Sequence, residues 1–299
     1  MDIAALMGCL SSPACIVTQA TGGLIIGMLL FLVAAGLTLI FGVLKVVNFT
    51  HGSFYMLGAY FALTIFQITG SYALTIAGAG VATAIVGLIF ERLFISRVYG
   101  QNVLMQLLVC YGFVLIFDDL VKIIWGPEFK SMGMPQAFAV PPLFIAGGVV
   151  PPFYLFVVGM AFIIGLALWL LIDRTRLGKT IRAAAFNPNM VAALGINTDY
   201  LYGLVFALGG LLAGFAGALA APVRSLTPGM GFSVLIESFI VTVIGGMGSI
   251  IGAVITGFGL GVIEGLTKVF YPEASTTVIF VIMVIVLILR PAGLFGKER

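Results

Sequence analysis

Polar side chains between two apolar runs are the part of this sequence best suited to handling a solute. The segment NFTHGSFY carries Asn48, Thr50, His51 and Ser53. Such groups are costly at membrane depth unless they are paired or hydrated. One interpretation is a helix break that lines a path, in which Asn48, His51 and Ser53 offer donors and acceptors; the other is a tight interfacial turn whose side chains cap the flanking helices. An exposed His51 would titrate near neutral pH, but we do not assign it as a proton carrier.

A single carboxylate, Glu237, lies in the apolar run FSVLIESFIVTVI, with no Lys or Arg within one helical turn. An unpaired carboxylate in a membrane span faces a partner helix, a cavity or water. We therefore predict that Glu237 lines a path or a subunit interface, with a place near the outer surface as the alternative. Asp118 with Lys122, and Glu264 with Lys268, are four residues apart and are predicted to form local pairs.

No motif for catalysis or nucleotide hydrolysis is present. GxxxxGK[ST], HExxH and GxSxG are all missing, so we expect no enzyme activity, no catalytic residues and no ATP hydrolysis by this chain. Three cysteines and one histidine are too few for an ordinary zinc site, and no metal ligands are predicted. Cys9 and Cys15 would pair if the N-terminus faced an oxidising compartment, but two idle thiols are the favoured interpretation.

The composition requires these residues to be positioned by membrane-spanning helices. Hydrophobic residues make up 62% of the 299 residues, charged residues 8%, and mean hydropathy is +1.24. A chain so poor in charge cannot keep its surface in water. Hydropathy predicts an all-α polytopic membrane protein, one transmembrane domain over residues 1–299 with about eight or nine spans. The predicted spans are 21–43, 53–69, 72–90, 103–124, 153–172, 200–221, 232–246, 250–270 and 276–290.

Some details of these spans remain open. Gly-broken pieces around 245–252 would also fit half-helices. Rows of glycine, Gly210 with Gly214 and Gly257 with Gly261 and Gly265, are predicted to form small-residue packing faces. No basic region precedes Lys45, so we predict no signal peptide and a first span that is retained.

Lys and Arg in the short loops give the predicted orientation. The loops 91–101 and 173–199 and the C-terminus are basic, the last through Arg290, Lys297 and Arg299. All three belong on the cytoplasmic side. The segment 126–152 and the N-terminus then face the outside.

The segment 173–199 is too apolar for a disordered loop and too polar for a span. Asn187-Pro188 breaks its middle, because the residue before proline avoids helical geometry while proline suits a helix start. We predict two short helices with Gly195 as a C-cap. They form either a packed surface loop or a docking element for a soluble partner.

Four segments, in order along nearly the whole chain, resemble those of the branched-chain amino-acid ABC transporter permease family, and most of all its H-type subunit. They are GLTLIFGVLKVVNFTHGSFYMLGAY (36–60), RAAAFNPNMVAALGI (182–196), VTVIGGMGSIIGAVITGFGLGVIE (241–264) and RPAGLFG (290–296). The resemblance implies a permease of a bacterial inner-membrane importer with a related M-type permease, two cytoplasmic ATPases and a periplasmic substrate-binding protein. ATP and Mg would be held by the ATPases, and this chain would bind no cofactor and no nucleic acid.

The same resemblance implies that 173–199 is the cytoplasmic coupling segment and that 126–152 is a periplasmic loop. Residues at the ATPase contact would be Arg182, Ala184, Asn187, Ala192 and Gly195, with Arg182 pairing with a partner carboxylate. The implied fold has two related halves around the path. HGSFYMLGAY and MGSIIGAV share Gly-Ser and a later Gly-Ala, an echo too weak to define an inverted repeat alone.

The substrate and the class of transporter have alternatives. A mostly aliphatic path with a few polar groups suits a branched-chain amino acid, but also another small amino acid, an amide, urea or a small aromatic acid. A stand-alone proton-coupled transporter that uses Glu237 or His51 is the second hypothesis, and a passive channel or scaffold the third. The docking-like 173–199 segment favours the importer, because a proton-coupled carrier does not need it.

Overall fold

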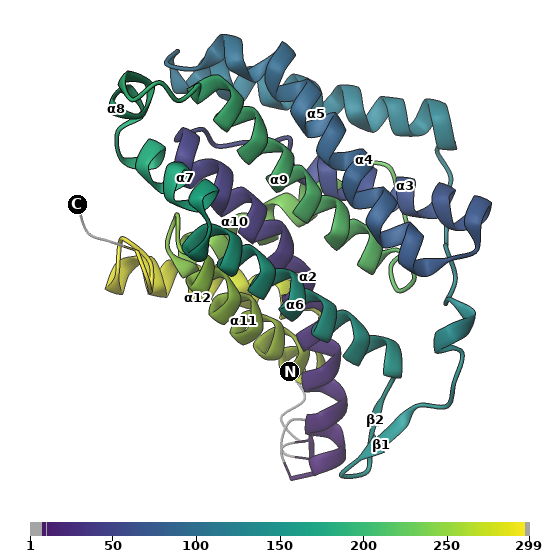
Figure 1. The fold of residues 1–299 in the computed structure, drawn as a ribbon. Helices are drawn as coiled ribbons and strands as arrows, with labels where there is room; N and C mark the ends of the chain where they lie inside the picture. The colour runs from purple at the N-terminus through teal and green to yellow at the C-terminus, as the bar shows by residue number, and fades with distance from the viewer. Residues whose placement is uncertain (1–7, 10, 297–299) are drawn as a thin grey trace.

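The apolar runs form long helices in the computed structural model, which describes residues 8–9 and 11–296 (Figure 1). The helices are α2 (Pro13–Leu44), α3 (His51–Thr69), α4 (Tyr72–Leu93), α5 (Val103–Trp125), α6 (Pro152–Arg174), α7 (Arg176–Phe186), α8 (Pro188–Ala193), α9 (Thr198–Ala220), α10 (Met230–Gly245), α11 (Ile250–Phe270) and α12 (Ser275–Leu289). Short 3-10 turns are η1 (Ile95–Val98), η2 (Gln136–Phe138) and η3 (Pro272–Ala274). Lys297 and Arg299, used above for orientation, lie outside the described residues.

Every predicted span is a helix, which confirms the all-α polytopic architecture. Among the described residues, six helical segments are long and apolar enough to cross a membrane: α2, α4 with η1, α6, α9, α11, and α12 with η3. The spans predicted at 53–69, 103–124 and 232–246 correspond to α3, α5 and α10, which are outside that group. Residues 246–249 are a turn between α10 and α11, where Ser249 caps α11 by accepting from Gly252 N at 3.0 Å.

The helices pack as two related halves. The first half consists of α2, α3 and α4, and the second consists of α9, α10 and α11. The first helix of each half packs along the last helix of the other: α2 packs along α11, and α9 packs along α4. Figure 1 shows α2 and α9 crossing while running in opposite directions. The first helices of the two halves therefore run in opposite directions, as they do in the inverted repeats of many transporters.

Reciprocal glycine contacts mark where the two halves meet. A Cβ on Gly36 would lie 2.9 Å from the carbonyl oxygen of Gly209, and one on Gly209 would lie 3.4 Å from that of Gly36. A Cβ on Gly231 would likewise lie 2.6 Å from the Gly52 carbonyl, and one on Gly52 would overlap the Gly231 carbonyl. The structure thus pairs the start of α3 with the start of α10, and not with the segment MGSIIGAV whose sequence echoes it.

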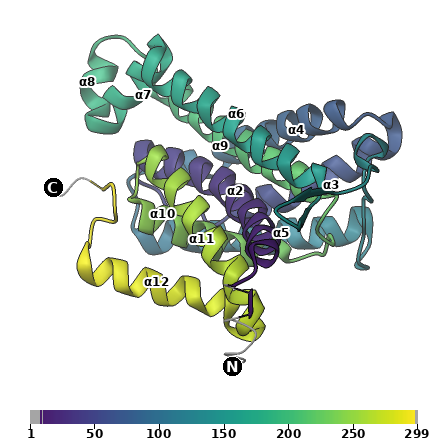
Figure 2. The same cartoon turned by 90° about the horizontal axis from the view of Figure 1, so that it is seen from below.

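Small residues also bring α2 and α11 together. Gly257, Gly261 and Gly265 face the backbone of Gly23 and Gly27, and added Cβ atoms would meet that backbone at 2.8 Å or less. This confirms the predicted packing face on α11. Figure 2 shows the α2–α11 pair between α6 on one side and α12 on the other.

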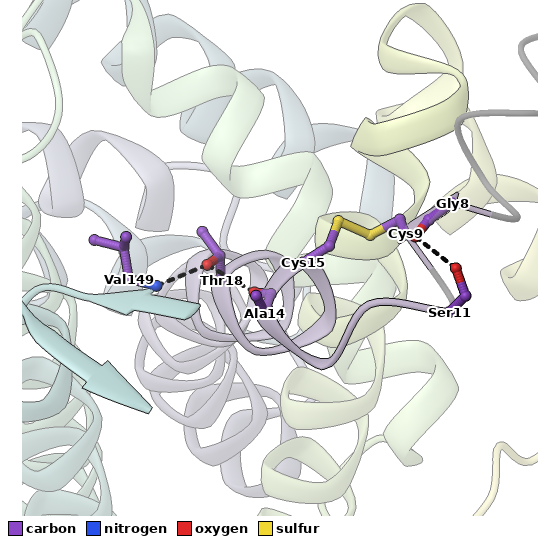
Figure 3. Close-up of a disulfide and its surroundings, with 7 residues drawn as sticks. All are labelled: Gly8, Cys9, Ser11, Ala14, Cys15, Thr18 and Val149. Carbon is purple, nitrogen blue, oxygen red and sulfur yellow. Dashed lines mark hydrogen bonds between the residues drawn. A yellow bond between two sulfur atoms is a disulfide. The ribbon is translucent and has the colours of Figure 1, made fainter. Parts of the chain in front are cut away.

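The N-terminal end of α2 carries a disulfide and a β-hairpin (Figure 3). Cys9 and Cys15 are bonded, with a Cα–Cα distance of 5.2 Å, so the favoured interpretation of two idle thiols is wrong. Strands β1 (Leu143–Ile145) and β2 (Gly148–Val150) pair antiparallel, with Phe144 opposite Val149. Val149 N donates to Thr18 Oγ1 at 2.9 Å, and this bond fixes the hairpin on the second turn of α2.

Candidate functional site

The break between α2 and α3 returns the chain into the bundle. Lys45 ends α2 in the left-handed region, at φ 58°. Six residues later His51 begins α3, and its Nε2 lies 3.1 Å from the carbonyl oxygen of Val33. Val33 precedes the end of α2 by 11 residues, which corresponds to about 16 Å along the helix. After α2 ends, the chain therefore runs back along α2 before α3 starts, as expected for a helix break at depth.

The N-cap side chain of this break does not cap the first turn of α3. Thr50 occupies the N-cap position of α3, but its side chain makes no capping hydrogen bond. Asn48 Oδ1 instead accepts from Thr50 N at 3.1 Å and lies 3.9 Å from the Cys110 Sγ of α5. Asn48, Thr50 and His51 are fully buried, so the condition of an exposed imidazole is not met.

Three polar atoms of this break have no protein partner within hydrogen-bonding distance: Asn48 Nδ2, Thr50 Oγ1 and His51 Nδ1. Asn48 also contributes to a cavity of about 70 Å³ between the break and α10. Leu37, Val47, Phe49, Leu235, Ile236 and Phe239 complete its lining, and all of them are apolar. Ser53 is buried two residues into α3 and is not part of that lining.

Glu237 has an electrostatic partner that the sequence did not reveal. Arg224, in the turn after α9, interacts with Glu237 on α10 and with the Tyr55 hydroxyl on α3. The predicted Glu264–Lys268 pair is present at 2.7 Å. Of the predicted Asp118–Lys122 pair the structure keeps an electrostatic interaction, but the close ion pair of Lys122 Nζ is with Asp119 Oδ1 at 2.8 Å, because i,i+3 spacing also brings side chains together.

The segment 173–199 folds as predicted, into α7 and α8. Thr175 Oγ1 caps α7 by accepting from Gly178 N at 3.0 Å, and Asn187 Oδ1 caps α8 by accepting from Met190 N at 3.1 Å. Gly195 follows α8 with φ 82°, and its N–H donates to Ala192 O at 2.9 Å. Figure 1 shows α7 and α8 at the opposite end of the molecule from the hairpin.

The residues implied at a partner contact divide into two groups. Asn187, Ala192 and Gly195 are exposed, whereas Ala184 is 1% exposed and packs inside the chain. Arg182 forms an ion pair with Asp173 and donates to Ile172 O at 2.6 Å. Arg182 therefore joins α7 to α6, while about half of its side chain stays exposed.

An apolar patch on α7 and α8 was not predicted as a unit. Phe186 is 92% exposed, Met190 64% and Leu194 76%. Their spacing of four residues across Asn187-Pro188 is the signal that would have found them. Exposed apolar groups beside polar ones mark an interaction surface, so this patch suits docking of a protein partner.

Comparison with known proteins adds an independent result. The family described as branched-chain amino acid transport system / permease component matches residues 19–288. The chain is 32% identical to the high-affinity branched-chain amino acid transport system permease protein BraD of Pseudomonas aeruginosa, over 94% of this chain and 96% of the relative. It is 30% identical to LivH of Escherichia coli, of the same description, with the same coverage, and 29% identical to a probable LivH of Methanocaldococcus jannaschii, over 93% and 91%. No solved structure matches the chain significantly.

Proposed function

The chain belongs to the family of branched-chain amino acid transport permeases, and from this premise we propose that it is the H-type membrane subunit of a binding-protein-dependent ABC importer. Its relatives are named for branched-chain amino acid transport, and they are similar over nearly their whole length. On this proposal the chain has no catalytic activity of its own. A related M-type permease completes the pore, two ATPases supply ATP and Mg, and a periplasmic protein delivers the substrate.

The observation that carries this proposal is the apolar patch on α7 and α8. The patch consists of Phe186, Met190 and Leu194 and lies at the end of the bundle that is rich in Lys and Arg. The distribution of these basic residues predicts that this end faces the cytoplasm. Asp173 and Arg182 tie α7 to the end of α6, so a force on the patch passes to a long helix. This is the construction that an ATPase partner needs in order to move the membrane helices.

The path of the substrate is proposed along α3, α10 and the break between α2 and α3. Asn48 supplies a polar atom within an apolar lining, His51 lies three residues further along the same break, and Glu237 with Arg224 supplies opposite charges for a zwitterion. Ser53 belongs to the same element. The aliphatic surroundings suit a branched-chain side chain.

Leucine uptake into proteoliposomes tests the proposal. This chain and its partner subunits are reconstituted, and uptake of radiolabelled leucine is measured with and without internal ATP. Phe186→Asp should weaken ATPase binding by roughly thirtyfold, because losing an interface anchor costs about 2 kcal/mol. Uptake should fall accordingly while the variant still inserts.

Phe186→Leu is the matched control, since it keeps an apolar side chain on the patch and should retain uptake within a few-fold. Leucine movement by this chain alone, driven by a pH gradient without ATPases, would contradict the importer and favour a proton-coupled carrier.

A further inference from the structure

We propose that a groove formed by α2, α6 and α11 binds an anionic phospholipid of the adjacent leaflet, with an acyl chain between the helices and the headgroup phosphate at their basic end. The proposal rests on two contiguous cavities and on the charges at one of them. It does not depend on which solute is transported.

The first cavity, about 250 Å³, is almost entirely apolar. Its lining includes Met28 and Phe31 of α2, Phe162 and Leu166 of α6, and Ile255 of α11. Gly165 keeps it open on the α6 side, because a Cβ there would lie 2.8 Å from the Phe31 ring. Such a slot between lipid-facing helices is filled by something apolar in a membrane.

The second cavity, about 520 Å³, continues from the first toward the end of the bundle that carries α7. Trp169, Ile250 and Ile251 line both cavities. The helices α2, α6 and α11 each contribute residues to the first and to the second cavity. On α2 and its C-cap the lining runs from Met28 to Lys45, which corresponds to about 26 Å of helix rise, slightly more than the depth of one leaflet with its headgroups.

Charge complementarity identifies the occupant. Lys45, Arg182 and Asp173 are the charged residues in the lining of the second cavity, which leaves a net positive charge. Arg174 adds a guanidinium whose Cζ lies 5.8 Å from the centre of the Trp169 ring. Ser249 Oγ accepts from Gly252 N, so its hydroxyl proton is available to a phosphate oxygen. An apolar slot that ends in a basic pocket matches an anionic lipid, whereas a soluble anion would have no use for the slot.

Trp169 is a built-in reporter for this site. The chain has two tryptophans, and Trp125 lies at the end of α5 toward the other side of the bundle. The full chain with Trp125→Phe is reconstituted in phosphatidylcholine vesicles that contain a minority of phosphatidylglycerol brominated on its acyl chains. Fluorescence quenching is compared with that from the same fraction of brominated phosphatidylcholine.

We expect the anionic lipid to be enriched about fivefold at Trp169, as one net charge near a headgroup would give. Lys45→Gln should remove most of that enrichment, and Asp173→Asn should increase it. Arg97→Gln is the matched control, because Arg97 is exposed at the same end but outside both cavities, and it should change nothing.

Several outcomes would overturn the site. Equal quenching by both lipids would show that the second cavity does not distinguish between their headgroups. No quenching by either lipid would show that protein covers the first cavity. An equal loss in Lys45→Gln and Arg97→Gln would reduce the effect to general surface charge. Loss of the preference when inorganic phosphate is added would show binding of a free anion rather than a lipid.

Discussion

At the scale of single residues, the polar groups gather at two places around α3. His51 and Asn48 lie at its start, and Arg224 meets Tyr55 and Glu237 beside its second turn. A carboxylate and a guanidinium removed from water stabilise each other, and either one left alone is costly. The Arg224–Glu237 interaction is therefore expected to stabilise the fold and, on the proposed function, to be the place where a zwitterion binds.

A double-mutant cycle in leucine uptake tests this coupling. Arg224→Gln and Glu237→Gln should each reduce uptake, because each leaves the other charge unpaired. The double variant should lose less than the two losses combined, with a coupling of about 1 kcal/mol or more. The same double-mutant cycle on the Glu264–Lys268 pair serves as the comparison for the coupling measured between Arg224 and Glu237. Strict additivity of the two changes would show that Arg224 and Glu237 act separately.

At the scale of elements, close helix crossings decide where α3 can begin. Gly36 lets α2 approach both α9 and the imidazole of α3: a Cβ on Gly36 would lie 2.8 Å from His51 Nε2 and 2.9 Å from Gly209 O. Gly42, on the same helix, has room, since its Cβ would meet Gly248 Cα at 3.5 Å. The two glycines thus offer a matched pair for measuring the cost of a methyl group.

Gly36→Ala should destabilise the protein by about 1–3 kcal/mol, the range for overpacking a tight interior, and Gly42→Ala by much less. Thermal unfolding in detergent measures both. If both variants unfold at the same temperature, α2 and α9 can move apart at Gly36 without loss of stability. The close approach at Gly36 then does not hold His51 in place.

At the scale of the whole molecule, the ends of the bundle differ in chemistry. One end carries the Cys9–Cys15 disulfide and the hairpin, and the other carries α7, α8 and most of the basic residues. Disulfides persist in oxidising compartments, and Lys and Arg accumulate on the cytoplasmic side. Both signals predict the same orientation, in which the hairpin faces the periplasm.

Labelling of single cysteines in intact cells tests this orientation. Phe144→Cys in β1 and Phe186→Cys in α7 are suitable because the native residues are 72% and 92% exposed, and Cys110 is buried. A membrane-impermeant maleimide should label Phe144→Cys in intact cells and Phe186→Cys after permeabilisation. The reverse pattern would invert the proposed topology.

Features that depend on local sequence were predictable, and those that depend on distant contacts were not. Apolar runs predicted the helices, and Asn187-Pro188 and Gly195 predicted α7 and α8, because spans and caps are set within a few residues. The partner of Glu237 lies 13 positions away in a turn, and the inward position of Ala184 depends on packing within the chain. The depth of His51 depends on Gly36 and Gly209, which bring α2 and α9 together.

The reciprocal glycine pairs, Gly36 with Gly209 and Gly52 with Gly231, have a consequence for motion. They place a two-fold pseudo-axis across the bundle, between halves that run in opposite directions. A rotation about that axis exchanges the two ends of the molecule. A rearrangement that opens the path at one end is therefore geometrically equivalent to one that opens it at the other. On the proposed function, the outward-open and inward-open shapes are expected to be a single asymmetric shape in which the two halves exchange roles.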